Sequence, residues 1–190
     1  MQASATASRS KSRRPGEDEL SLDYHRELAS RVPGECVLQA MDDQLHWVCE
    51  LAGSLSAEQI DKVHKPYTWT IRQVVEHCVD AERIGGDRML RIAAGDQGNQ
   101  PAWDENAYAA ARFGLGNMRE LISELGYCRQ ANTTLLRRIN PRAWDNVGTV
   151  DGNRISVRGM AWVTAGHLLH HLEIIEQRCD IHVPRGPQMT

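Results

Sequence analysis

VRGMAWVTAGHLLHHLEIIEQR, residues 157–178, carries the pattern that decides the fold. Apolar residues recur in it at steps of three and four, which is the period of one face of an α-helix. The inward face of this helix is predicted to carry Met160, Val163, Thr164, His167, His171, Ile174 and Arg178. Two histidines therefore lie on a helix face that is otherwise mostly apolar.

The same period recurs in three earlier segments. They cover residues 35–55, 70–95 and 117–140. Thr70 and Gln73 form a capping box at the start of the second segment, and Gly95 marks its end. Asn117 begins the third segment, which ends before Pro141. Four amphipathic helices predict an all-α protein, a four-helix bundle.

The connections between these helices carry weaker signals. VGTVDGNRISV, residues 147–157, has β-branched residues on both sides of Asp151-Gly152-Asn153, which predicts a small β-hairpin before the last helix. Residues 20–31 are expected to form a shorter helix or an extended arm. Residues 106–112 are expected to form a short helix after an ordered loop at Trp103.

Length and composition suit one domain. With 190 residues, 41% of them hydrophobic, the chain can bury a sizeable core. We expect a flexible N-terminal tail over residues 1–18, a single bundle domain over residues 19–182 and a C-terminal tail over residues 183–190.

The net charge and the length of the apolar runs limit which partners the protein can have. A net charge of -3 gives no general attraction to nucleic acid or to an anionic membrane, and no apolar run approaches the roughly 20 residues that span a bilayer. The five cysteines are scattered without CxxC pairs, as in reduced cytoplasmic proteins. The first 16 residues lack the apolar core of a secretory signal, which favours a cytoplasmic location over the alternative of an organelle address.

His167 and His171 are four residues apart. On a helix this spacing places them about 40° apart and one turn along, so that two imidazoles could bind one metal ion, as in the HExxH motif. No glutamate follows His167, which disfavours a protease of that type.

His77 lies on the apolar face of the second predicted helix. If that helix neighbours the last one, three imidazoles could converge. Burying three imidazoles without partners costs free energy, and one metal ion would give all three a partner. The alternatives are a core histidine bonded to a carbonyl and a chance HxxxH pair. The spacing alone leaves these readings open.

Three segments together resemble a known family. They are YTWTIRQVVEHCVDAER (67–83), WDENAY (103–108) and GHLLHHLEII (166–175). The chain is similar, from about residue 31 to residue 178, to the DinB-like (YfiT-like) metal-binding four-helix bundles. One departure is Tyr67-Thr68, where the family often has a lysine or a glycine-lysine before the tryptophan.

The resemblance implies an up-down-down-up helix order and a metal triad of His77, His167 and His171. It implies zinc or nickel as the ion and a homodimer as a frequent assembly. Characterised relatives include thiol-dependent S-transferases, a thiol-dependent isomerase and proteins described as metal-dependent hydrolases.

Asp80 and His170 are the candidate proton acceptors. Asp80 lies three residues after His77 and could accept a hydrogen bond from a ligand imidazole, or form a salt bridge with Arg83 or Arg88 instead. His170 points away from His171 and is expected beside the site or at the surface.

Four residues are candidates for the substrate pocket. Arg88 returns to the face of His77 after eleven residues and could bind a substrate carboxylate, with an internal ion pair as the alternative. Trp103, Asp104 and Tyr108 are expected at the mouth, and Trp69 in the core.

These expectations describe a metal-dependent enzyme acting on a small-molecule substrate, either a hydrolase or a thiol S-transferase. A divalent transition metal is the predicted cofactor, zinc first and nickel second, with a low-molecular-weight thiol as a further candidate. The alternatives are a non-catalytic binding or stress-response module stabilised by a metal, and a bundle without metal.

Overall fold

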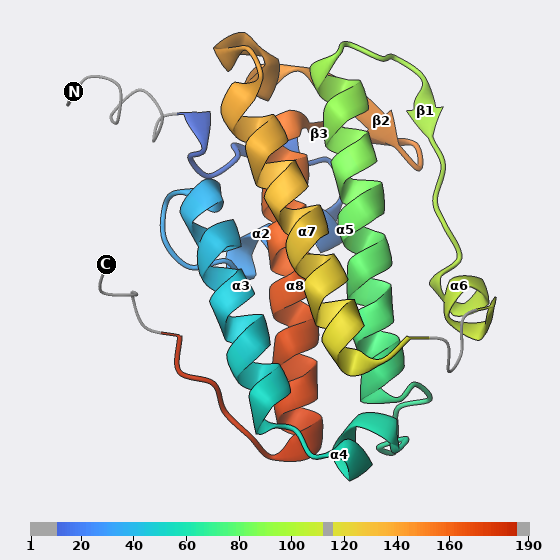
Figure 1. The fold of residues 1–190 in the computed structure, drawn as a ribbon. Coiled ribbons are helices and arrows are strands. Elements are labelled where there is room, and N and C mark those ends of the chain that lie inside the picture. Colours follow the sequence, from blue (N-terminus) through green and yellow to red (C-terminus); the bar gives the residue numbers. More distant parts are fainter. Residues whose placement is uncertain (1–10, 112–115, 186–190) are drawn as a thin grey trace.

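Four long helices form the body of the protein in a computed structural model that describes residues 11–111 and 116–185 (Figure 1). They are α3 (Val37–Ser54), α5 (Ile71–Ala93), α7 (Met118–Arg138) and α8 (Val157–Cys179). Helices α3 and α8 run in one direction and α5 and α7 in the other, and α5 packs against both α7 and α8. This confirms the predicted four-helix bundle and its up-down-down-up order.

Side-chain caps fix where three of the long helices, α5, α7 and α8, begin. Thr70 Oγ1 accepts a hydrogen bond from the Gln73 amide at 3.2 Å, and Gln73 Oε1 accepts one from the Thr70 amide at 3.0 Å. Asn117 Oδ1 accepts a hydrogen bond from the Glu120 amide at the start of α7, and Ser156 Oγ accepts one from the Gly159 amide at the start of α8. These bonds satisfy amides that have no partner within the first turn, and they place the helix starts at the predicted residues.

A small sheet lies at the end of the bundle where α8 begins. Strands β2 (Val147–Val150) and β3 (Asn153–Ser156) form the predicted hairpin, with Asp151 and Gly152 at positive φ in its turn. Strand β1 (Asn99–Gln100) pairs with β2 in parallel. The sequence did not predict β1, because two residues are too few to show a period.

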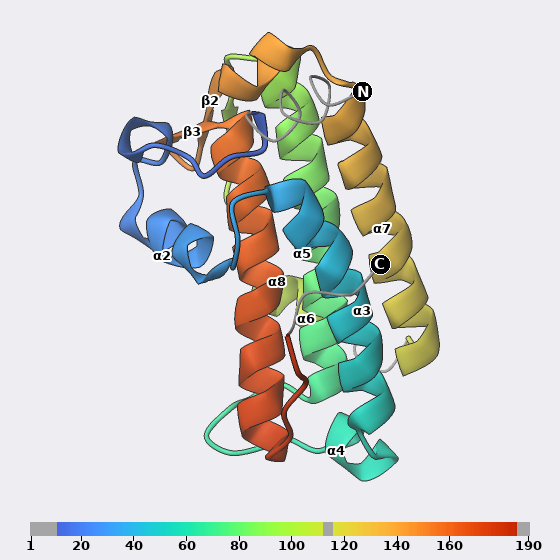
Figure 2. The same cartoon turned by 90° about the vertical axis from the view of Figure 1, so that its left-hand side faces the viewer.

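Shorter helices occupy the connections. They are α2 (Asp23–Arg31), α4 (Ala57–Asp61), α6 (Glu105–Ala111) and the 3-10 helices η1 (Glu17–Glu19) and η2 (Pro141–Asp145). Helix α2 lies against the outer side of α8 (Figure 2), so residues 23–31 are a helix rather than an extended arm. A Cβ on Gly166 of α8 would lie 2.0 Å from the Leu28 carbonyl oxygen, so only glycine allows α2 so close.

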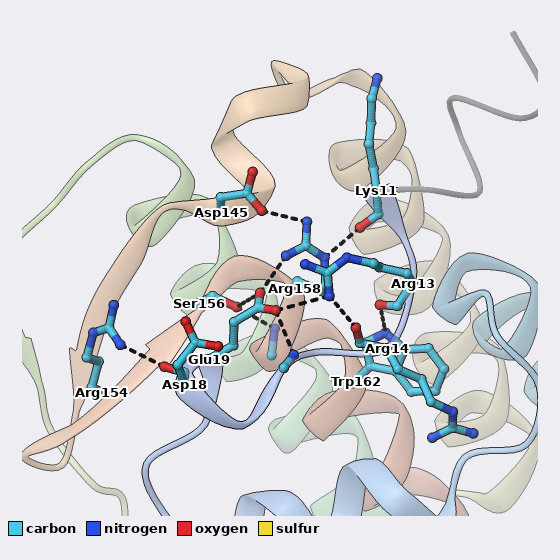
Figure 3. Close-up of polar contacts among 12 residues, drawn as sticks. Lys11, Arg13, Arg14, Asp18, Glu19, Asp145, Arg154, Ser156, Arg158 and Trp162 are labelled. Atoms are coloured by element: carbon cyan, nitrogen blue, oxygen red, sulfur yellow. Dashed lines mark hydrogen bonds and ion pairs between the residues drawn. The ribbon is translucent and has the colours of Figure 1, made fainter. Parts of the chain in front are cut away.

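The segment before α2 is held against α8 by polar contacts (Figure 3). The buried Arg158 guanidinium donates to the Lys11 carbonyl at 2.9 Å and forms ion pairs with Glu19 and Asp145. Trp162 Nε1 donates to the Arg13 carbonyl at 2.7 Å. Residues 11–18 of the predicted N-terminal tail therefore contact the bundle, while residues 1–10 lie outside the described residues.

At the other end, the backbone amide of Val183 donates to the carboxylate of Glu176 at 2.7 Å. Residues 186–190 of the predicted C-terminal tail lie outside the described residues. No helix in the described part of the chain is long and apolar enough to cross a membrane.

The core is divided along the bundle axis. One apolar cluster surrounds Trp162 near the sheet, and a second surrounds Trp47 at the opposite end. Between them lie four buried polar side chains, which we call the polar layer: Gln44, Glu82, Arg129 and Asn132. The predicted helix faces did not include this layer.

The polar layer joins all four long helices. Arg129 forms an ion pair with Glu82 at 2.8 Å and donates to Gln44 Oε1 at 2.9 Å. Asn132 donates to Glu82 Oε1 at 2.7 Å, and Gln44 Nε2 donates to the Ala165 carbonyl of α8 at 2.8 Å. Because both members of the ion pair are fully buried, each needs these partners to offset its loss of hydration.

Candidate metal centre

Three histidines from two helices converge on one point. His77 of α5 and His167 and His171 of α8 each offer a ring nitrogen, and the three nitrogens lie within 4.8 Å of one another. His167 Nε2 is 3.0 Å from His77 Nε2 and 3.2 Å from His171 Nε2. The antiparallel packing of α5 on α8 thus brings the predicted triad together.

Hydrogen bonding alone does not satisfy this arrangement. The Nε2 atom of a neutral imidazole is either a donor of one proton or an acceptor with one lone pair. His167 Nε2 therefore forms a hydrogen bond with one of its two neighbours and not with both. A metal ion with about 2.0 Å bonds to three nitrogens would hold them about 3.3 Å apart, close to the 3.0 and 3.2 Å that separate His167 Nε2 from its two neighbours. The donor set could hold a divalent metal.

Burial keeps these imidazoles neutral, which is the state that binds a metal. It lowers the pKa of His77 to about 4. Burial, followed by the nearby His77, His170 and Arg129, lowers the pKa of His167 to about 3. Burial and the neighbouring histidines also hold the pKa of His171 well below its usual value. All three imidazoles are thus unprotonated at neutral pH.

The triad lies in the wall of a cavity of about 460 Å³. Helices α2, α5 and α8 and the loop before α6 line it. His77 stacks on Trp103 with ring centroids 5.2 Å apart and the planes 11° from parallel, and Trp103 contacts the ring of Tyr108 edge-on. The predicted pocket residues Arg88 and Trp103 both line the cavity, and half-exposed Tyr108 lies beside Trp103.

The two candidate proton acceptors differ in position. His170 lines the cavity with its ring 5.2 Å from that of His171, and burial lowers its pKa. Asp80 is buried on α5, and the described cavity lining does not include it. Asp104, a predicted pocket residue, instead caps α6, where its Oδ1 accepts hydrogen bonds from the amides of Asn106 and Ala107.

Several lining residues were not predicted. Tyr24, His25 and Leu28 come from α2, whose position depends on the close approach at Gly166. Glu82 also lines the cavity, and no local signal in the sequence distinguished it from an exposed helix carboxylate. Trp69, expected in the core, packs against it but also lines the cavity, with its ring 5.3 Å from His77.

The fold and the triad define a four-helix bundle protein with a candidate metal site between two helices. The sequence profile of the DinB superfamily matches residues 38–175, and the chain belongs to this superfamily, which confirms the family that the motifs indicated.

Among solved structures, the chain is similar to YfiT from Bacillus subtilis, described as a probable metal-dependent hydrolase with an unusual four-helix bundle topology. The TM-score is 0.66 at 17% identity, over 77% of this chain and 87% of that chain. At this identity the likeness shows the fold. No curated protein matches the chain.

Proposed function

We propose that the protein is a metal-dependent enzyme that acts on a small molecule, as a hydrolase or a thiol S-transferase, with zinc held by His77, His167 and His171. One observation carries the proposal: three neutral imidazoles face one another in the wall of a cavity of about 460 Å³. Three protein ligands leave a coordination position for a further ligand, which is the arrangement of catalytic rather than structural zinc sites.

When bound, a divalent ion with a free position acts as a Lewis acid and lowers the pKa of a water or thiol placed there. His170 lines the same cavity and is kept neutral by burial, so its ring can accept a proton. It is a better candidate than Asp80, which is outside the described lining. Trp69 and Trp103 cover His77 and limit the access of water.

The thiol of an S-transfer reaction would come from a small molecule rather than from this chain. All five cysteines are free, and Cys78 lines the cavity. Burial raises the pKa of the Cys78 thiol far above its usual range, so it is a poor nucleophile. A low-molecular-weight thiol remains the proposed co-substrate for this branch.

Elemental analysis tests the metal assignment first. We expect about one divalent ion per chain after purification or reconstitution with zinc, and loss of this ion in His77→Ala and His171→Ala, because two imidazoles are too few for a stable site. His46→Ala is the matched control, since His46 is exposed on α3. Nickel in place of zinc would change only the identity of the ion. Metal-free wild-type protein, or unchanged metal in the triad variants, would overturn the assignment.

Assays of the zinc-loaded protein then test the enzyme. A panel of esters, amides and thiol-plus-electrophile pairs should show turnover in one class, and both triad variants should lose it. An unchanged panel would contradict an enzymatic role. The competing proposal, a metal-stabilised module without catalysis, predicts instead a large drop in Tm on chelation and no turnover. The cavity beside the triad favours the enzyme.

A further inference from the structure

Arg88 brings a positive charge to the cavity without an ion-pair partner in the described part of the chain. It lies on α5 eleven residues after His77, is half-buried and lines the same cavity. Its Nη2 donates to the Pro101 carbonyl at 2.8 Å, and within the described part of the chain no carboxylate forms an ion pair with it. A guanidinium has five N–H donors and stays charged. Arg88 therefore has donors and charge available for a ligand.

His25 supplies a second group to the same part of the cavity. It comes from α2, and its Nδ1 is buried without a hydrogen-bond partner in the described part of the chain. His25 and Arg88 line both this cavity and a smaller one beside it, so the two side chains lie near each other. Burial lowers the pKa of His25, and the charge of Arg88 lowers it further. A buried ring nitrogen without a partner is costly unless a ligand or water satisfies it.

The nearby carboxylates leave this region open to an anion. Glu82 lines the cavity but is neutralised by Arg129. Glu105 is exposed at the start of α6, where water screens its charge. Asp151 and exposed Asp87 also interact with the charge of Arg88, but Asp151 lines a separate cavity of about 190 Å³ and neither carboxylate lines the cavity of the triad, so an anion is favoured on the side of the triad.

We propose that Arg88 and His25 form a subsite for a carboxylate, so that the substrate is a small molecule with a carboxylate at one end and its reacting group at the triad. This rests on the proposed function. One guanidinium and one neutral imidazole match a single negative charge better than a doubly charged phosphate. Eleven residues of α5 span about 16 Å, and the side chains of His77 and Arg88 reach across part of this distance. We therefore expect a spacer of several bonds between the carboxylate of the ligand and its reacting group.

Two thiols that differ only in the distal group test the subsite. Mercaptohexanoate and uncharged mercaptohexanol are titrated into cobalt-loaded protein, and thiol binding is followed by the near-ultraviolet band of a cobalt–sulfur bond. We expect wild-type protein to prefer the acid, and Arg88→Gln to bind it about 10- to 100-fold more weakly with little change for the alcohol. Mercaptopropionate, which is too short to reach Arg88, should bind equally to both proteins.

Arg91→Gln is the matched control. Arg91 lies one turn further along α5, pairs with Asp96 at 2.7 Å and is not among the residues that line the cavity. It removes the same charge, and the preference for the acid should persist. His25→Ala should reduce the preference by less than Arg88→Gln. Equal binding of acid and alcohol by wild-type protein, or an unchanged preference in Arg88→Gln, would overturn the subsite.

A metal-free titration separates the two proposals. Hexanoate and hexanol are added to metal-free protein, and binding is followed by tryptophan fluorescence, since Trp103 lines the cavity. A preference for hexanoate that Arg88→Gln abolishes supports the subsite even if no thiol band forms on cobalt. If no thiol band forms on cobalt, the metal has no position open to a thiol, and the proposed function is wrong. No preference in either titration overturns the subsite.

Discussion

His167 is the residue on which the triad depends, because its Nε2 faces both other imidazoles. Burial already keeps this ring and that of His77 neutral, so an ion arriving at pH 7 displaces few protons. The low pKa values of these rings reduce the stability of the metal-free protein at lower pH. There the unfolded chain binds protons that the folded chain excludes.

We therefore expect the metal-free protein to lose stability as the pH falls. The pKa values of His77 and His167 are about 4 and about 3 when folded, and about 6.5 when unfolded. Between these limits the unfolded state binds more protons, so each histidine lowers the free energy of unfolding by about 1.4 kcal/mol per pH unit as the pH falls. Above pH 6.5 both contributions are flat. Urea unfolding at pH 7.5 and pH 5 measures the difference.

The variant His77→Asn supplies the comparison for this measurement. It removes one titrating ring, so its stability should depend less steeply on pH than that of the wild type. Zinc-loaded wild-type protein should be at least as sensitive as the metal-free protein, because the ion binds only the neutral rings and so keeps protons off the folded state. Identical slopes for wild type and variant would show that His77 is not the group responsible.

At the scale of elements, the sequence predicts what each helix encodes within itself. Thr70 and Asn117 cap α5 and α7 locally, and the spacing of His167 and His171 is a property of α8 alone. The features that the sequence could not predict depend on contacts between segments that are distant in the chain. Helix α2 is placed by Gly166, so His25 could not be assigned to the cavity.

Gly166→Ala tests the contact between α2 and α8. A methyl group there would meet the Leu28 carbonyl at 2.0 Å, so α2 must shift, and we expect a loss of about 1–3 kcal/mol in stability. Gly126→Ala, within α7 and with no atom closer than 4 Å, should instead stabilise the protein by about 0.5–1 kcal/mol. Denaturant unfolding measures both. A Gly166→Ala protein as stable as Gly126→Ala would contradict the close approach.

At the scale of the whole molecule, two apolar clusters are separated by the polar layer. Its residues look like ordinary helix polar residues in the sequence, because nothing local distinguishes buried Arg129 from an exposed arginine such as Arg83. Only the packing of α5 on α7 shows which of the two is enclosed.

These two arginines allow a direct comparison, because both pair with a glutamate across α5 and α7. Arg129→Met leaves buried Glu82 without its cation and should cost about 3–5 kcal/mol. Arg83→Met breaks the exposed pair with Glu124 and should cost about 1 kcal/mol or less. Adding Glu82→Leu to Arg129→Met should restore part of the loss. Equal costs in the two single variants, measured by urea unfolding, would argue against the buried pair.

The polar layer also fixes the position of the four helices along the bundle axis. Apolar helix faces can slide past one another by a turn, about 5.4 Å, and still bury similar surface. The bonds among Gln44, Glu82 and Arg129, and the bond from Gln44 to the Ala165 carbonyl, form at only one setting. That setting places His77 level with His167 before any ion is present. The three candidate ligands are therefore preorganised, and little ordering would remain to oppose the binding of a metal.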